Sequence, residues 1–231
     1  VIVKDGKIIG EGYHEFFGEN HAEINAFNNC AEDPVDADLY VNLEPCSYFG
    51  KTPPCTKNII SNSITNVFIG MKDPNEKVNG SGIELLERAG IKVVCGIMEK
   101  ECEEQNIGFI HWIKTGRPWV IAKVAQTKNG YMGIDSNQSI WLTGEDSKKE
   151  VHKLRSKVDG VLVGRKTAEI DNPRLTVRKV LGNNPARIIA DTFRKLSLNL
   201  DIFKDKESKN IVLCSSNMFK NSKTSFCEYL T

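Results

Sequence analysis

The sequence predicts two consecutive α/β domains. At 231 residues the chain is long enough for two hydrophobic cores. Apolar runs typical of strands alternate with helical patterns along its length. The charge also changes sign: residues 1–115 carry 10 Lys and Arg against 18 Asp and Glu, net −8, and residues 116–231 carry 21 against 12, net +9. We therefore predict domains over 1–115 and 116–231, separated by the segment 114–118, which contains Gly and Pro.

The composition is that of an ordinary soluble protein, with 40% hydrophobic residues, 26% charged residues and a net charge of +1. No apolar run approaches the roughly 18 residues that span a bilayer, and no signal peptide is visible, so we expect no membrane partner. Seven cysteines without dense pairing favour a reducing cytoplasm. The chain starts without Met inside a strand pattern and stops soon after another, so we expect the natural protein to continue at both ends.

The first domain is predicted to be a mixed α/β sandwich of about five strands. Asp5-Gly6 predicts a hairpin turn, Asp33-Pro34 predicts a helix end, and Ile24 and Phe27 are expected on the inner face of that helix. The expected elements, in order, are strands over 1–4 and 7–12, a helix over 21–31, a strand over 38–43, a helix over 55–61, a strand over 67–71, a helix over 83–89, a strand over 91–95 and an amphipathic helix over 99–113.

The second domain is predicted to contain a sheet rich in parallel strands, because strands alternate with helices. The expected elements are an apolar strand over 119–125, a turn over 126–130, a helix over 145–157 and a strand over 158–163. Neither a Rossmann nor a Walker fingerprint is present, so generic motifs do not predict a nucleotide site. The lysine clusters lack interleaved aromatic residues, and we expect no nucleic-acid partner.

The residues most indicative of chemistry are His21, Cys46 and Cys55, with Glu23 two positions after the histidine. One imidazole and two thiols can hold zinc while water takes the fourth position. Zinc lowers the pKa of that water toward about 7, so that hydroxide exists at neutral pH. A carboxylate that stays off the metal can then carry the proton. The pattern predicts a hydrolytic zinc site with Glu23 as its catalytic residue.

Two plainer interpretations remain open at this point. The cysteines and histidine could be packing residues, since cysteine is among the most buried residue types. They could also form a closed structural zinc site, which requires a fourth ligand. Cys30 is the one close candidate, and it is predicted to lie on the helix that begins at His21. The combination of Glu after His and Pro before Cys favours the catalytic interpretation.

The motif resembles that of the zinc-dependent base deaminases, which carry His-x-Glu followed by Pro-Cys and a second Cys. Eight residues separate Cys46 from Cys55 here, where two are common, and this insert ends in Lys-Thr-Pro-Pro-Cys. In that respect the chain resembles the bifunctional deaminase/reductases of riboflavin biosynthesis. The resemblance implies a cytidine-deaminase-like α/β/α sandwich followed by a dihydrofolate-reductase-like α/β domain.

The same resemblance implies two activities on small phosphoribosyl-pyrimidines. A diaminopyrimidinone carrying a ribosylamino phosphate would be deaminated hydrolytically with Zn²⁺, and the ribose chain of the aminouracil product would then be reduced by NADPH. It also implies a homo-oligomer. Two other functions stay open: a different base or nucleoside deaminase fused to an unrelated domain, and a zinc-binding scaffold without catalysis.

The resemblance also implies binding residues in both domains. For the deaminase substrate they are His14, Lys51, Asp73 and Asn75. For NADPH they are Ala125, Trp141, Thr167, Asp171 and Thr192. For the reductase substrate they are Ser139, Arg155, Leu175 and Arg178.

Several of these residues have plainer interpretations. His14 can be a loop residue, Asp73-Pro74-Asn75 can be a turn, Trp141 can be a core residue and Arg155 a surface helix residue. The family often has Asp where this chain has Asn129 and Asn172, and it continues with a glycine-rich phosphate loop. The remaining cysteines are expected to be inert thiols, and they are Cys95, Cys102, Cys214 and Cys227.

Overall fold

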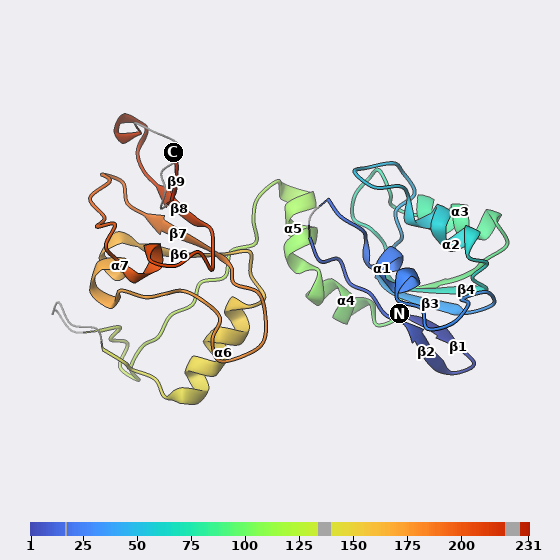
Figure 1. Ribbon diagram of the computed structural model, residues 1–231, viewed down its shortest axis with the longest axis horizontal. Coiled ribbons are helices and arrows are strands. Elements are labelled where there is room, and N and C mark those ends of the chain that lie inside the picture. The colour runs from blue at the N-terminus through green and yellow to red at the C-terminus, as the bar shows by residue number, and fades with distance from the viewer. Residues whose placement is uncertain (17, 134–139, 220–226) are drawn as a thin grey trace. The chain divides into compact units, whose positions relative to one another are not determined.

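The computed structural model describes residues 1–16, 18–133, 140–219 and 227–231 (Figure 1). The chain divides into two compact units, Val1–Ile121 and Ala122–Thr231. The boundary inferred from the sequence, after residue 115, falls at the last residue of a helix inside the first unit. No helix among the described residues has both the length and the apolar character needed to cross a membrane.

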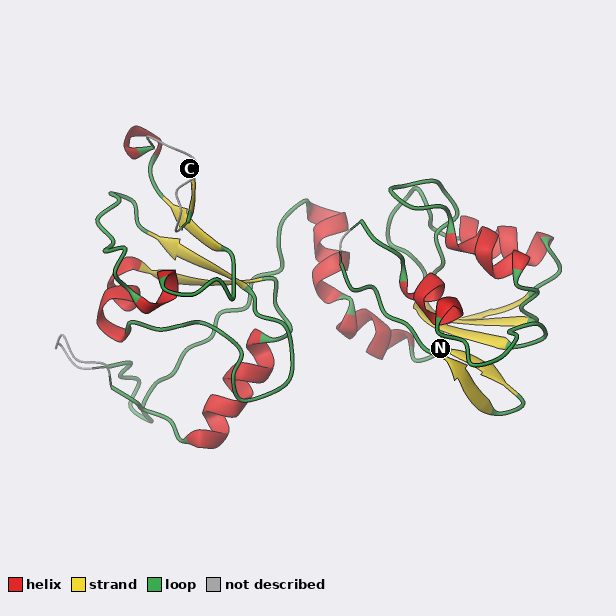
Figure 2. Ribbon diagram, in the orientation of Figure 1, coloured by secondary structure: helices red, strands yellow, loops and turns green. Residues whose placement is uncertain are grey.

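The first unit is built on a mixed five-stranded sheet with the order β2-β1-β3-β4-β5. Its strands are yellow in Figure 2. The β1–β2 hairpin turns at Asp5-Gly6, where both residues have positive φ, and β1 also pairs antiparallel with β3. The pairs β3–β4 and β4–β5 are parallel. The strands are β1 (Ile2–Lys4), β2 (Lys7–Gly10), β3 (Asp38–Leu43), β4 (Asn66–Met71) and β5 (Lys92–Cys95).

Helices cover both faces of this sheet, as the two sides of β4 show. Val67 and Ile69 point into the main core, and Gly70 on the opposite face lies so close to Cys102 that a Cβ there would be 2.3 Å from its sulfur. Cys102 belongs to α4, so α4 lies on the other side of the sheet from the core helices. The helices are α1 (Ala22–Asn28), α2 (Cys55–Ser61), α3 (Ser81–Arg88), α4 (Glu99–Gln105) and α5 (Ile107–Thr115). The predicted α/β/α sandwich is confirmed.

The main core lies between the sheet and helices α1, α2 and α3. Leu39, Ile59, Ile69 and Leu86 are each fully buried there. Burying an aliphatic side chain of this size contributes about 1.5–3 kcal/mol. Helix α1 packs very closely on the chain after β2, since a Cβ on Gly12 would lie 2.3 Å from the amide nitrogen of Ala26. This close packing holds α1 against the chain that follows β2.

Two details of the first unit differ from the sequence-based expectation. The helix predicted over 99–113 is two helices, α4 and α5, which meet at Asn106. The Asn106 side chain donates to the carbonyl of Cys102 at 2.8 Å, and such local bonds compete with continuous helix. On α1 the buried residues are Glu23 and Ala26; Phe27 packs partly against the core, and Ile24 is only half-buried.

The second unit contains a fully parallel sheet with the order β6-β7-β8-β9, which confirms the expected parallel-rich α/β domain. Its core includes Ala168, Ile189, Ile202 and Val212. Cys214 and Cys227 are buried in the same core. The elements are α6 (Glu145–Arg155), β6 (Gly160–Gly164), α7 (Arg165–Asp171), β7 (Ala186–Ala190), η1 (Asp201–Phe203), β8 (Asn210–Leu213), η2 (Ser216–Met218) and β9 (Glu228–Leu230).

The strand predicted over 119–125 is wrong for this structure. The segment is irregular, and Trp119, Val120 and Val124 are exposed. An apolar, β-branched run acquires strand structure only when a neighbouring strand pairs with its backbone. Among the described residues, neither sheet includes this segment. Its composition therefore predicted the wrong element.

Candidate metal centre

Three separate elements bring His21, Cys46 and Cys55 together. His21 is the extended residue that immediately precedes α1, Cys46 follows the end of β3, and Cys55 is the first residue of α2. Helices α1 and α2 contact each other. The carbonyl of Cys46 accepts hydrogen bonds from the amide and hydroxyl of Thr56, at 3.2 and 3.3 Å, which ties the loop after β3 to α2.

The distances between the three side chains fit a tetrahedral zinc ion. The Nδ1 atom of His21 lies 3.5 Å from the sulfur of Cys46 and 3.3 Å from that of Cys55. All three ligand atoms lie within 4.8 Å of one another. Zinc binds nitrogen at about 2.0–2.1 Å and sulfur at about 2.3 Å. At a tetrahedral angle these bond lengths place the nitrogen and the sulfur roughly 3.5 Å from each other. The residues present are therefore suited to zinc through Nδ1 and two sulfurs.

The two thiols are electrostatically unequal. A hydrogen bond from the Cys55 thiol, with further ones from the His21 ring and from the Cys55 amide at 3.3 Å, lowers the pKa of Cys46 to about 4. The pKa of Cys55 is raised, because its thiol is the donor and because it is buried. The hydrogen bond to Cys46 raises the pKa of His21. The hydrogen bonds thus favour the thiolate, the form that binds metal, at Cys46 rather than at Cys55.

Glu23 lies beside this group without belonging to it. It is the second residue of α1, only 9% exposed, and burial raises the pKa of its carboxyl group. A carboxyl group with a raised pKa can both accept and release a proton near neutral pH. Its role as the catalytic proton carrier stays a prediction, and the geometry is compatible with it.

Cys30, the candidate fourth ligand, lies elsewhere. Its sulfur is 3.4 Å from the carbonyl oxygen of Ala26 and packs partly against the main core. Within residues 1–16, 18–133, 140–219 and 227–231, the ligand group consists of His21, Cys46 and Cys55. Three ligands of this kind would leave one tetrahedral position for water, as in catalytic zinc sites.

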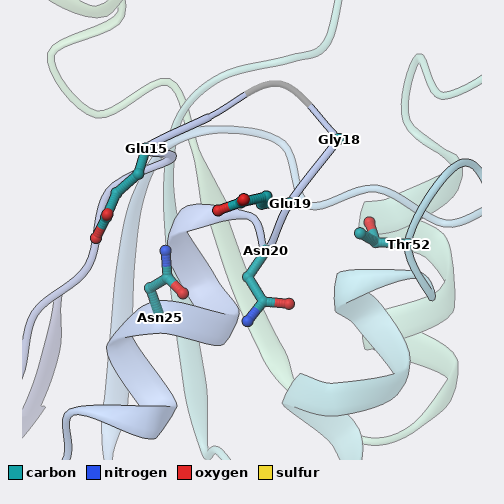
Figure 3. A pocket seen from close by; sticks show the side chains of 6 residues that line it. All are labelled: Glu15, Gly18, Glu19, Asn20, Asn25 and Thr52. Atoms are coloured by element: carbon teal, nitrogen blue, oxygen red, sulfur yellow. The ribbon is translucent and has the colours of Figure 1, made fainter.

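A hollow of about 380 Å³ opens beside the start of α1 (Figure 3). It is lined by Glu15, Gly18, Glu19, Asn20, Asn25 and Thr52. Asn20 directly precedes His21, and Thr52 belongs to the insert between the two cysteines. The insert also brings Lys51 to this side, because a Cβ on Gly18 would lie 3.7 Å from its Nζ.

The structure places His14, one of the predicted substrate residues, next to the ligand histidine. The two imidazole rings meet edge to face with centroids 5.5 Å apart, and His14 Nδ1 lies 3.0 Å from the carbonyl oxygen of Asn20. His14 therefore lies beside the candidate ligand His21, and Lys51 lies beside Gly18 in the loop that leads to it. Their roles as substrate ligands are not tested by these contacts.

Asp73 and Asn75 follow β4 at the edge of the sheet where Cys46 follows β3. Asp73 is 8% exposed, burial raises its pKa, and its Oδ1 accepts from the amide of Asn75 at 2.8 Å. The amide of Asp73 donates to Glu44 at 3.2 Å. Sequence patterns assign Glu44 no role, because its partners are backbone groups far along the chain that no motif reveals.

In the second unit the structure brings together the residues predicted for the reductase substrate, except for Ser139, which lies outside the described residues. Arg155 donates to the carbonyl of Thr176 at 2.6 Å, and Arg178 donates to its hydroxyl at 2.7 Å. Leu175 is buried beside them in a left-handed conformation. Burial and nearby Arg178 lower the pKa of Arg155.

Two residues of this cluster were not predicted. The amide of Arg178 donates to His152 Nδ1 at 3.0 Å, and His152 and Thr176 are both buried. His152 could have been predicted from its spacing, because residues three apart on a helix, such as His152 and Arg155 on α6, are neighbours on its surface.

The predicted NADPH residues are more dispersed. Thr167 and Asp171 lie one turn apart on α7, which follows β6, and Thr192 follows the neighbouring parallel strand β7. Trp141 is 73% exposed, with Lys148 Nζ 4.2 Å from its ring centre, so it is not a core residue. No hydrogen bond or ring contact in the described part of the chain joins Ala125 or Trp141 to the other three.

Comparison with known proteins defines the class of each unit. Residues 1–71 match the family described as the cytidine and deoxycytidylate deaminase zinc-binding region, and residues 118–230 match the family described as the RibD C-terminal domain. The chain thus combines a zinc-binding deaminase-type domain with a RibD-type C-terminal domain.

Individual relatives carry both parts. The chain is 41% identical over 213 residues to the riboflavin biosynthesis protein RibD of Actinobacillus pleuropneumoniae and 42% identical over 214 residues to that of Aquifex aeolicus. Each match covers 92% of this chain, but 57% and 60% of the respective relatives.

A solved structure agrees with these relatives. The diaminohydroxyphosphoribosylaminopyrimidine deaminase/5-amino-6-(5-phosphoribosylamino)uracil reductase of Thermotoga maritima matches with a TM-score of 0.85 at 38% identity, over 99% of this chain and 65% of that one. Over most of its length the chain is therefore similar to RibD proteins of riboflavin biosynthesis.

Proposed function

We propose that the chain carries out two successive steps of riboflavin biosynthesis, beginning with zinc-dependent deamination of a diaminopyrimidinone that bears a ribosylamino phosphate. The observation that carries the first step is the convergence of His21, Cys46 and Cys55 within 4.8 Å, with the buried carboxyl group of Glu23 beside them. The identity to RibD proteins over most of this chain supports the choice of substrate.

The catalytic work of the protein side chains in deamination falls to Glu23. When bound, zinc would lower the pKa of water in its open position toward about 7. Glu23 takes the proton from this water and gives it to a ring nitrogen as the new carbon–oxygen bond forms. Glu23 would then take the remaining proton from the newly added hydroxyl group and pass it to the amine, so that the carbon–nitrogen bond breaks, the carbonyl forms and ammonia leaves. The buried position of Glu23 suits both transfers, because it keeps the carboxyl pKa raised.

Four polar side chains would hold the deaminase substrate. His14 lies beside His21, and Lys51 belongs to the insert between the two cysteines, beside Gly18. Both can meet the ribose phosphate, Lys51 as a point charge. Asp73 and Asn75, past the end of β4, offer both an acceptor and a donor to the amino and oxo groups of the pyrimidine.

The second unit would then reduce the ribose chain of the aminouracil product with hydride from NADPH. Arg155 and Arg178 would bind the phosphate as two guanidinium forks, with Leu175 and Ser139 alongside. The cofactor would lie against Thr167, Asp171 and Thr192, with Ala125 and Trp141. A crevice at the carboxyl ends of β6 and β7 is the usual ligand position in a parallel sheet.

A homo-oligomer in a reducing cytoplasm, without nucleic-acid or membrane partners, remains our expectation for the natural protein. All seven cysteines are described and none of them forms a disulfide, which suits such a compartment.

The test is incubation of the zinc-loaded chain with the diaminopyrimidinone phosphate, with and without NADPH, followed by mass spectrometry. We expect one amino group to be replaced by oxygen without NADPH, and two further hydrogens to be gained with it. Zinc binding without ammonia release would leave the scaffold interpretation standing. Ammonia release from cytidine or adenosine, but not from this substrate, would favour another deaminase.

A further inference from the structure

The carboxyl group of Glu44 is buried at the end of β3 and is hydrogen-bonded to backbone amides from one distant segment. It is only 3% exposed. Its Oε2 accepts from Asp73 at 3.2 Å, and both oxygens accept from Gly80, at 2.9 and 3.0 Å. Its Oε1 also accepts from Gly82 at 2.9 Å and from Ile83 at 3.4 Å. One side chain thus fixes both ends of the segment 73–83.

We propose that Glu44 is a positioning residue for deamination, which holds the segment 73–83 in place relative to the metal ligand Cys46. This inference rests on the proposed deaminase function. Glu44 and Cys46 follow the same strand, separated only by Pro45, whose ring fixes its backbone φ. The Glu44 carboxylate therefore holds the main chain of Asp73 at a fixed distance from the loop that carries Cys46. Asp73 in turn holds Asn75, because its Oδ1 accepts from the Asn75 amide.

The start of α3 explains why a carboxylate is needed there. The first amides of a helix have no partner inside the helix and are usually capped by a local side chain. Here the N-cap is Gly80, with φ 93° and no side chain, so the helix has no local cap. Glu44 accepts from the amides of Gly80, Gly82 and Ile83 instead, and its negative charge suits the helix N-terminus.

Two further contacts hold the same segments together. The hydroxyl groups of Ser47 and Ser81 are 2.6 Å apart. A Cβ on Gly82 would lie 2.2 Å from the carbonyl oxygen of Pro45, so only glycine allows this approach. The loop of Cys46 and the start of α3 are therefore in direct contact.

Substitution of Glu44 by glutamine distinguishes a role in positioning the segment 73–83 from a role in folding alone. Glu44→Gln keeps the volume but replaces one acceptor with a donor. If the remaining oxygen stays with Gly80, Gly82 and Ile83, the new NH₂ group faces the amide of Asp73, and two donors oppose each other. The segment then loses its fixed position while the metal ligands stay unchanged.

The experiment compares Glu44→Gln with Glu76→Gln, an exposed carboxylate in the same segment. Zinc content and ammonia release from the diaminopyrimidinone phosphate are measured for both. For Glu44→Gln we expect zinc to be retained and KM to rise about tenfold or more, the scale of a lost hydrogen bond to a charged group. For Glu76→Gln we expect the zinc content and the KM to match those of the wild type. A role in folding alone would lower kcat through a smaller active fraction and leave KM unchanged, which would overturn the proposal.

A double-mutant cycle with Asp73→Ala tests whether Glu44 affects substrate binding through Asp73. If Glu44 acts through Asp73, Glu44→Gln should add much less to KM in the Asp73→Ala background than in the wild type. Additive effects would show that Glu44 acts elsewhere and would overturn the proposal.

A measurement without catalysis separates this inference from the proposed function. Amide hydrogen exchange at Gly80 and Gly82 should be faster in Glu44→Gln than in both the wild type and Glu76→Gln, with exchange in β3 unchanged. If the wild type releases no ammonia, the proposed function fails, and this exchange then decides whether Glu44 orders the segment. Unchanged exchange at both glycines would refute that ordering.

Discussion

The two units of this chain differ in how their predicted sites are assembled. In the first unit, three ligands between positions 21 and 55 form one group with atoms within 4.8 Å. In the second, Arg155, Leu175 and Arg178 gather around Thr176, whereas no hydrogen bond or ring contact among the described residues joins the predicted NADPH residues to that cluster. A metal site makes strict demands on a few residues, whereas a cofactor crevice depends on loops that follow several strands.

Burial differs between the candidate metal centre and the predicted NADPH residues. Cys55 is fully buried and Glu23 is 9% exposed, whereas Trp141 is 73% exposed. Proton transfer and metal binding benefit from a dry, fixed environment, because interactions between charges are stronger where water is excluded. We therefore expect substitutions at the first site to have the larger and more specific effects.

The largest effect is expected from loss of a metal ligand. Cys55→Ala should abolish zinc binding, because two remaining ligands do not make a tetrahedral site, and deamination should fall to the background rate. Metal analysis and ammonia release measure this. Cys95→Ala, at an exposed thiol, should keep wild-type zinc and activity. Full zinc in Cys55→Ala would remove that residue from the site.

The next effect concerns the proton carrier. Glu23→Gln should keep its zinc but reduce deaminase turnover by about 10² or more, the scale of general acid-base catalysis. The exposed Glu32→Gln is the matched control and should be unaffected. Wild-type turnover in Glu23→Gln would exclude Glu23 from the mechanism, and loss of zinc would show that it supports the metal site instead.

A smaller effect is expected in the second unit. Arg178→Lys should raise KM for the aminouracil phosphate about tenfold, because lysine cannot replace a bidentate guanidinium contact. Reductase kinetics with NADPH in excess measure this, and deamination should not change. Arg174→Lys, an exposed arginine in the same segment, serves as the control. An equal KM in both variants would mean that Arg178 does not bind the phosphate.

The smallest effects are expected in the two cores. Ile59→Val and Ile189→Val each shorten a fully buried side chain, at a cost of about 0.5–1.5 kcal/mol of unfolding free energy. Hydrogen exchange resolved by peptide should show reduced protection only in the first unit for Ile59→Val and only in the second unit for Ile189→Val. Ile59→Val should also retain its zinc. A loss spread over both units would contradict two independent cores.

Much of the first unit could be predicted from sequence because its signals are local. The strand Asp38–Leu43 and the helix Cys55–Ser61 have the predicted bounds, and the Asp5-Gly6 hairpin forms as its turn residues indicate. The metal group could be predicted because its residue types and their order along the chain already indicate zinc chemistry. Glu44 could not be found in this way, since its partners are main-chain amides at Asp73, Gly80, Gly82 and Ile83.

The failures have a common physical reason. The segment 119–125 has strand composition, but strand structure depends on pairing that lies outside the segment itself. The break at Asn106 depends on one side-chain bond to Cys102 in a pattern that otherwise indicates a single helix. Short-range preference predicts elements well only where the tertiary surroundings agree with it.

The account depends most on the coordination of the metal, which X-ray absorption at the zinc edge measures directly in the zinc-loaded chain. It predicts two sulfur ligands at about 2.3 Å and two lighter ligands, one imidazole nitrogen and one water oxygen, at about 2.0–2.1 Å. A shell of three or four sulfurs, or a second imidazole in place of the water, would contradict a catalytic site at His21, Cys46 and Cys55.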